Sequence, residues 1–143
     1  MPQWLVGTIA AAVILVGLSL CDGSAQFRDV SDVRPYAGFV GNTCEIKMAV
    51  RAHGVTAIGS PYKQTDYVTV WEPGFTGPEV TFVEELQAGS KLRVRSARKC
   101  WNCPFDELIQ FVVDVEPRPE TFKDVPVYVR AETLMGNYMQ CKR

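Results

Sequence analysis

Five cysteines are the residues with the clearest capacity for chemistry: Cys21, Cys44, Cys100, Cys103 and Cys141. Cys21 follows an apolar N-terminal run and would be removed or lipidated during export. The other four cysteines would then remain as an even set. In an oxidising compartment an even set implies two disulfides, with three possible connectivities. Long loops lose the most chain entropy when a bond closes them. We therefore favour Cys141 bonded to Cys100 or Cys103, with Cys44 taking the other. A Cys100–Cys103 bond with Cys44–Cys141 as its companion is the alternative.

Cys100-Trp101-Asn102-Cys103 has the CxxC spacing of thiol oxidoreductases. That chemistry needs a thiolate stabilised at a helix N-terminus. Here the pair ends an expected strand, and the acidic residues Asp106 and Glu107 would raise a thiol pKa. A structural staple is therefore the favoured interpretation and a thiol-disulfide oxidoreductase the alternative. A zinc site is disfavoured, because a second CxxC is missing.

No other constellation indicates catalysis. His53 is the only histidine, and we expect it at the surface, at a strand end before Gly54. The pairs Glu84-Glu85 and Asp106-Glu107 are adjacent, and adjacent side chains on a strand point to opposite faces. No phosphate-binding loop, serine-nucleophile motif or calcium loop is found. We expect a non-catalytic protein with no cofactor and no metal.

A basic run is the best candidate for a binding surface. At strand spacing, three of its charges would line one face. The alternative is a solvated face whose charges pair with Glu84 or Glu85 across a hairpin. Three aromatic residues, Trp71, Phe75 and Trp101, would add a contact patch if exposed, although such residues more often belong to the core. The basic run consists of Lys91, Arg93, Arg95, Arg98 and Lys99.

The N-terminus has the pattern of a secretory signal peptide spanning residues 1–25. Trp4–Leu20 carries no charged side chain, and Gly23-Ser24-Ala25 offers the small residues that a signal peptidase reads. The expected mature chain begins at Gln26. An uncleaved membrane anchor is less favoured, because seventeen apolar residues are at the short limit for spanning a bilayer.

Cys21 offers a second processing route. Leu18-Ser19-Leu20-Cys21 resembles a bacterial lipoprotein signal, in which the cysteine is lipidated and becomes the new N-terminus. Such signals have Gly, Ala or Ser before the cysteine, whereas this chain has Leu20. Both routes lead to export, so we expect a periplasmic or cell-envelope protein, with a lipid anchor as the alternative to a free mature chain.

Length and composition indicate one folded domain after the signal. The chain has 143 residues, which leaves about 118 for residues 26–143, enough to bury an ordinary core. Hydrophobic residues make up 47% and charged residues 22%, which argues against disorder. The formal net charge of -1 gives the molecule no electrostatic reason to bind nucleic acid. A membrane would be contacted only through a lipid anchor or an uncleaved signal.

Short apolar alternations separated by Gly/Pro turns, with no long helical period, predict an all-β domain. We expect a small SH3-like or OB-like barrel, or a compact sandwich of about six strands. Val80–Leu86 and Leu92–Ser96 should form its central hairpin around Gly89. Pro126 suggests that the last strand begins at a sheet edge. The six expected strands are Thr43–His53, Asp66–Glu72, Val80–Leu86, Leu92–Ser96, Leu108–Val115 and Val125–Ala131.

Residues on the apolar side of each alternation should form the core. The residues expected to be buried are Ile46, Val70, Leu92, Val94, Phe111, Val113 and Val127.

Together, the signal pattern, the expected β domain and the lack of a catalytic constellation describe an exported, non-catalytic envelope protein. We expect it to bind another protein or an anionic envelope polymer.

Overall fold

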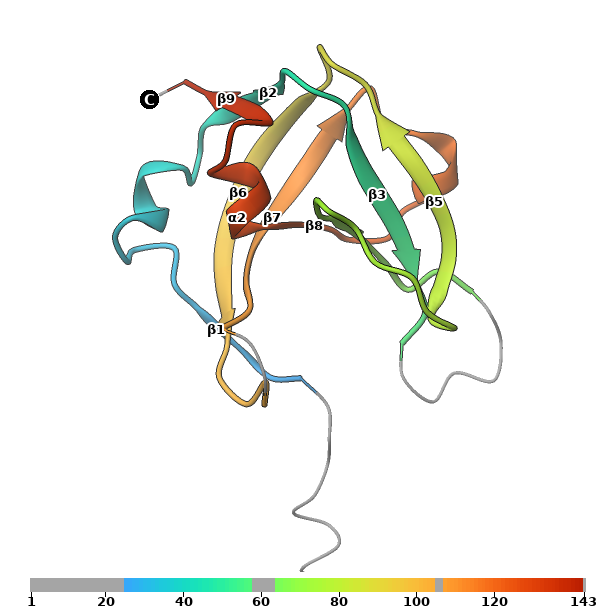
Figure 1. Ribbon diagram of the computed structural model, residues 1–143. Helices are drawn as coiled ribbons and strands as arrows, with labels where there is room; N and C mark the ends of the chain where they lie inside the picture. The colour runs from blue at the N-terminus through green and yellow to red at the C-terminus, as the bar shows by residue number, and fades with distance from the viewer. Residues whose placement is uncertain (1–24, 58–63, 105–106, 143) are drawn as a thin grey trace, which may run out of the picture.

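The structure is a computed structural model that describes residues 25–57, 64–104 and 107–142. Residues 1–24 of the expected signal segment, Cys21 included, lie outside these residues. Strands dominate the described part, with three short helical turns between them (Figure 1). The elements are β1 Phe27–Asp29, η1 Tyr36–Gly38, β2 Thr43–Ile46, β3 Val50–Val55, β4 Tyr67–Val70, β5 Val80–Leu86, β6 Lys91–Cys100, β7 Ile109–Glu116, η2 Glu120–Phe122, β8 Val127–Arg130, α2 Ala131–Leu134 and β9 Met139–Cys141.

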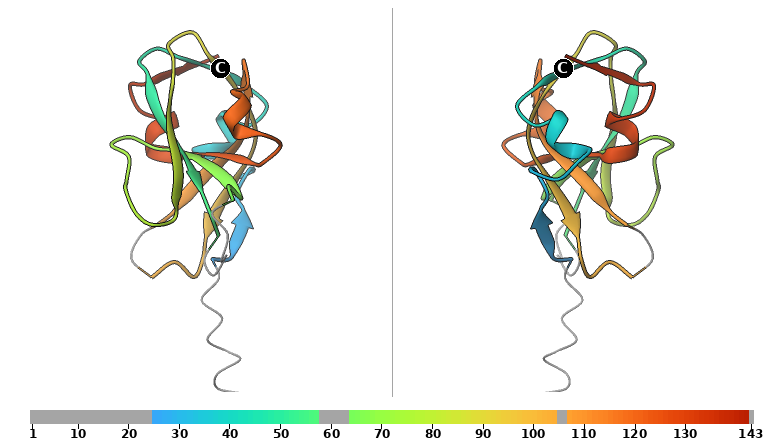
Figure 2. Two further views of the ribbon diagram at one scale, coloured as in Figure 1. Left: turned by 90° about the vertical axis from the view of Figure 1, so that its right-hand side faces the viewer. Right: turned by 90° about the vertical axis from the view of Figure 1, so that its left-hand side faces the viewer.

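The all-β prediction is confirmed: the described strands form one mixed sheet in the order β5-β3-β4-β8-β7-β6-β2-β9, with β1 added beside β6. Only β4 and β8 run parallel, and the other pairs are antiparallel. The sheet does not close into a barrel. It bends so that β3 and β5 face β6 and β7, which gives a compact, sandwich-like body (Figures 1 and 2). Within the described residues nine strands replace the expected six, because the first expected strand is divided in two and the short end strands β1 and β9 lack a clear alternation.

The expected central hairpin is wrong. β5 and β6 follow one another through the turn 87–90, but β5 pairs with β3, whereas β6 pairs with β7, β2 and β1. Gly89 has φ +94°, a conformation that suits glycine, and it donates from its backbone N–H to the Ile46 carbonyl. The turn is therefore the corner where the chain passes from one layer to the other. A hairpin and a corner carry the same turn residues, so sequence alone did not separate them.

The first expected strand is divided in two. The chain leaves β2 after Ile46 and enters β3 at Val50, so Met48, which would share the apolar face of one continuous strand with Ile46 and Val50, is 48% exposed. The backbone N–H groups of Lys47 and Met48 donate to the Tyr138 carbonyl. That contact holds the break in place.

The edge position suggested by Pro126 is also wrong. β8 lies inside the sheet, between β4 and β7. Pro126 immediately precedes the strand, so its missing N–H costs no ladder bond, and its carbonyl accepts from Val68 N–H.

The core prediction is confirmed, since all seven expected residues are at most 3% exposed. Phe111 sits at its centre, with its ring centroid 6.1 Å from that of Tyr36 and 5.7 Å from that of Phe39. Both partners come from the segment before β2, which thus covers one side of the core. Among the described helices none has the length and apolar character needed to cross a membrane.

Candidate functional site

The four cysteines of the β domain form two pairs at disulfide distance. Cys44 Sγ lies 1.97 Å from Cys141 Sγ, and Cys100 Sγ lies 1.95 Å from Cys103 Sγ. The favoured long-range pairing is therefore wrong, and the alternative pairing is the one found. The reason is register: β9 adds beside β2 so that Cys44 and Cys141 face each other directly, whereas Cys100 lies opposite Phe27 at the other end of β6.

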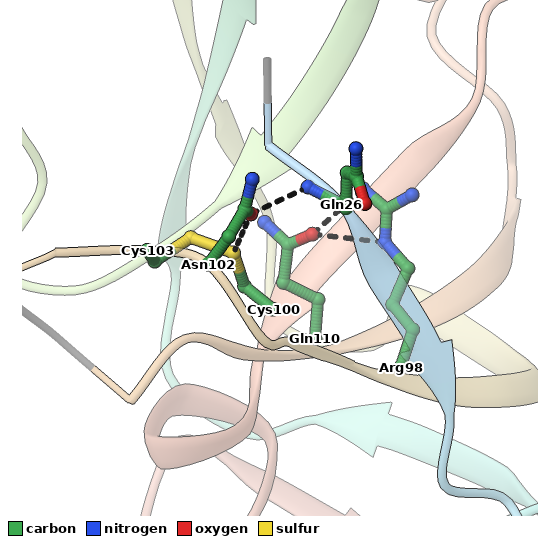
Figure 3. The surroundings of a disulfide bond; sticks show 6 residues. All are labelled: Gln26, Arg98, Cys100, Asn102, Cys103 and Gln110. Carbon is green, nitrogen blue, oxygen red and sulfur yellow. Dashed lines mark hydrogen bonds between the residues drawn. A yellow bond between two sulfur atoms is a disulfide. The ribbon is translucent and has the colours of Figure 1, made fainter. Parts of the chain in front are cut away.

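The CxxC loop is held by the start of the described chain (Figure 3). The Gln26 backbone N–H donates to Asn102 Oδ1 at 2.7 Å, and Trp101 N–H donates to the Gln26 carbonyl at 3.0 Å. Asn102 Oδ1 also lies 3.4 Å from Cys100 Sγ. Cys100 is only 4% exposed, and a strand rather than a helix follows the loop. These hydrogen bonds fix the loop to the start of β1, and among the described residues no helix begins at the cysteine pair, where its N-terminus would stabilise a thiolate.

The acidic residue described beside the loop is already engaged. Glu107 forms an ion pair with Lys99, and the Lys99 ammonium lowers the pKa of the Glu107 carboxyl. Its charge is thus largely compensated. Asp106, the other acidic residue expected to act on the thiols, lies outside the described residues.

The basic run is split by a β-bulge between Val94 and Ser96. Lys91, Arg93 and Arg95 are exposed, as their spacing predicts. Their acidic neighbours differ from those expected, because β5 is not beside β6. Lys91 lies opposite Glu45 and Glu116 in the strand register, Arg93 lies opposite Asp114, and Arg95 forms an ion pair with Asp114. The sheet surface formed by β6 and its neighbours β2 and β7 therefore carries both signs of charge.

Arg98 is separated from the other basic residues by its own packing. Its guanidinium carbon lies 3.7 Å from the ring centroids of both Phe27 and Tyr128. Its Nε and one terminal NH₂ donate to Gln110 Oε1 at 3.1 and 2.8 Å (Figure 3). Burial lowers the pKa of Arg98, although an arginine stays charged. Arg98 ties β1 to the sheet.

The surface position expected for His53 is wrong. It lies within β3 and is 1% exposed, because the 71–79 loop folds over it. Phe75 stacks on the imidazole with a centroid distance of 4.6 Å, and Phe75 N–H donates to Nε2 at 3.4 Å. Gly74, at φ +86°, would place a Cβ 3.1 Å from Nε2. Among the described residues Nδ1 has no hydrogen-bond partner.

A shallow groove on the outer face of the sheet is a site that the sequence analysis did not assemble. We call it the outer groove. It lies over β4, β8 and β7, where the register places Arg130 opposite Gln110 and the Arg130 guanidinium lies over the Trp71 ring. Leu108 also lines the groove, and its carbonyl accepts a hydrogen bond from Cys100 N–H. The residues that define the groove are Tyr67, Thr69, Trp71, Phe75, Gln110 and Arg130.

The aromatic walls of the outer groove are positioned by ring contacts. The Trp71 centroid lies 5.8 Å from that of Phe75, and the Arg130 guanidinium lies 4.4 Å from the Trp71 ring. Tyr67 contacts Tyr128 at 5.7 Å between centroids. Trp71 and Phe75 were expected in a contact patch or in the core, and they are half-buried here. Gln110 and Arg130 carried no sequence signal beyond facing away from the apolar side of their strands.

No cluster of three or more metal-ligating side chains occurs within the described ranges. Comparison with known proteins finds no family model, no curated protein and no solved structure that matches the chain.

Proposed function

We propose that this is an exported, non-catalytic cell-envelope protein whose β domain binds another protein or an envelope polymer. The observation that carries the proposal is the outer groove, where aromatic walls and a few polar groups converge. Ligand sites are typically built in this way. The apolar N-terminal segment with its small-residue cleavage pattern supports export. Two cysteine pairs at disulfide distance accord with an oxidising compartment.

The exposed basic residues of β6 are the second surface available to a partner. Lys91 and Arg93 form no ion pair with the described residues, so both can contact an anionic polymer. Their acidic neighbours Glu45 and Asp114 reduce the local positive potential. Because binding through this surface would depend on exposed charges, its affinity should fall as the salt concentration rises. The affinity of the outer groove should depend less on salt, because its walls are mainly aromatic.

A pull-down from envelope extract tests the proposal. The exported protein is immobilised and compared with a groove variant, Trp71→Ala, and a strand variant, Lys91→Ser/Arg93→Ser. We expect a protein or polymer that the unaltered chain retains and that one variant loses. Retention of nothing, or equal retention by all three proteins, would contradict a binding function at either surface.

A thiol-disulfide oxidoreductase is the second candidate, and the local Cys100–Cys103 bond is the observation that favours it. Such an enzyme needs a bond that opens readily to exchange. A thiol count after treatment with glutathione separates the two functions. A staple leaves no free thiols, whereas an enzyme yields two at Cys100 and Cys103 while the Cys44–Cys141 bond stays closed.

A further inference from the structure

Two polar side chains on the floor of the outer groove lack protein partners. Gln110 is 6% exposed and Thr69 is 7% exposed. Gln110 Oε1 accepts both bonds from Arg98, but its amide nitrogen donates to no group among the described residues, and the Thr69 hydroxyl has no partner there either. Among the described residues, only His53 Nδ1 is a side-chain polar atom that is both fully buried and unpartnered, so the free Gln110 and Thr69 atoms remain accessible from the groove. These groups therefore favour a ligand that returns hydrogen bonds to them.

The groove presents these donors next to aromatic surface. Trp71, Phe75 and Tyr67 supply the apolar walls, and Arg130 is the charged residue among those lining it. The Arg130 side chain is 17% exposed, and its Nε lies 3.6 Å from Glu132 Oε1, a distance that leaves its hydrogen-bonding capacity largely unused. The site thus combines flat apolar faces with an amide, a hydroxyl and a guanidinium.

The position of the groove argues against an extended peptide. Such a peptide binds by adding a strand to a free sheet edge. β4, β8 and β7 are each paired on both sides, so their backbone groups are already used. A nucleic acid strand is also disfavoured, because it needs a row of cations along a groove and Arg130 alone among the lining residues is charged.

We propose that the outer groove binds a pyranose ring of an envelope glycan. A pyranose has a face of C–H groups that packs on an aromatic ring, and equatorial hydroxyls that both donate and accept hydrogen bonds. Its hydroxyls accept from the Gln110 amide and from Arg130, and exchange a hydrogen bond with Thr69. A carboxylated sugar gains a further charge-assisted bond to Arg130. The proposal rests on the proposed binding function and names its ligand.

Titration of the exported protein with short oligosaccharides tests the inference. Three classes of oligosaccharide are used, built from neutral hexoses, from N-acetylhexosamines or from hexuronic acids. Binding is followed by calorimetry and by the NMR chemical shift of the Trp71 indole. We expect at least one class to bind and to shift that signal. A shift of the Trp101 signal alone, or no binding by any class, would overturn the inference.

Three variants locate the binding. Trp71→Ala should weaken affinity by about tenfold or more. Thr69→Val, which keeps the side-chain shape, should weaken it by about two- to tenfold. Trp101→Ala is the matched control, because Trp101 is 53% exposed and lies outside the groove, and it should bind as the unaltered chain does. If Trp71→Ala does not fold, Trp71→Phe with Thr69→Val decides. Unchanged affinity in both would overturn the site.

The outcome also separates this inference from the proposed function. If the pull-down captures a protein from envelope extract and the titration shows no oligosaccharide binding, the glycan assignment is contradicted and the proposed binding function is supported. Oligosaccharide binding by a chain that is found unexported and fully reduced in its host would support the groove and contradict the envelope assignment.

Discussion

At the scale of single residues, the burial of a side chain and what it contacts decide its role more than its type does. Arg98 was expected on a binding surface, but its guanidinium lies between the rings of Phe27 and Tyr128 and ties β1 to the sheet. His53 was expected in solvent but lies beneath Phe75. In both cases an aromatic residue distant in sequence covers the polar one. Sequence spacing alone carried no information about that cover.

The central position of Phe111 predicts a large loss of stability on truncation. Phe111→Ala removes a side chain that is 0% exposed and leaves a cavity beside Tyr36 and Phe39, so it should lower the free energy of unfolding by about 3–5 kcal/mol. Denaturant titration measures the change. Val112→Ala, on the opposite face of the same strand, is the control and should cost about 1 kcal/mol or less. Equal losses would mean that the faces of β7 are assigned wrongly.

The burial of His53 predicts a pH dependence of stability. Burial lowers the pKa of His53 below its ordinary value of 6.5, the charge of Arg51 adds to the shift, and the Thr69 backbone and Glu72 oppose it. The unfolded chain then binds the proton more readily than the folded one does. The stabilisation is fully present above pH 6.5 and is lost as the pH falls from there through the folded-state pKa.

Thermal unfolding of the unaltered chain and of His53→Gln between pH 7.5 and 5 measures this effect. The unaltered chain should lose stability as the pH falls, and the variant should show a flatter profile in that range. The carboxyl groups with lowered pKa values, such as those of Glu72 and Asp66, begin to lose their contribution only near pH 4.5 and below. Parallel profiles for the two proteins would contradict the assignment to His53.

At the scale of elements, the two cysteine pairs fasten different parts of the sheet. Cys44–Cys141 joins β2 to the C-terminal strand across a sequence separation of 97, whereas Cys100–Cys103 closes a separation of 3. Short end strands such as β9 bury little apolar surface, and chain ends fray unless they are tied down. The first pair therefore holds an element, and the second shapes a loop.

The difference in loop length predicts unequal losses when each pair is removed. On the chain-entropy account, Cys44→Ala/Cys141→Ala should lower the free energy of unfolding by about 4–5 kcal/mol, and Cys100→Ala/Cys103→Ala by about 2 kcal/mol. Each double variant serves as the control for the other in denaturant titration. A greater loss for the CxxC pair would show that the loop supports more of the fold than its length suggests.

The first strand of the sheet bears on the processing of the chain. β1 begins at Phe27, one residue after the expected cleavage point, and Gln26 is hydrogen-bonded to the CxxC loop. Cleavage before Gln26 would keep every contact of β1. We therefore predict that intact-mass measurement of the exported protein gives a chain starting at Gln26, with a lipidated Cys21 as the competing result. A mass that includes residues 1–20 would contradict both.

At the scale of the whole molecule, the sequence determined the fold class, the core and the faces of the long strands. Phe111, Val113 and Leu92 are buried because a period of two, with one apolar face, is a local property that the residues themselves encode. The same alternation placed Lys91 and Arg93 in solvent.

Only the tertiary structure decided which strands are neighbours. The turn at Gly89 was read correctly as a turn, but whether it makes a hairpin or a corner depends on β3 arriving beside β5. The cysteine pairing depends in the same way on β9 arriving beside β2. The outer groove depends on β8 lying between β4 and β7. Strand pairing is set by packing between segments far apart in the chain, and a single sequence records each segment's preference but not which partner it meets.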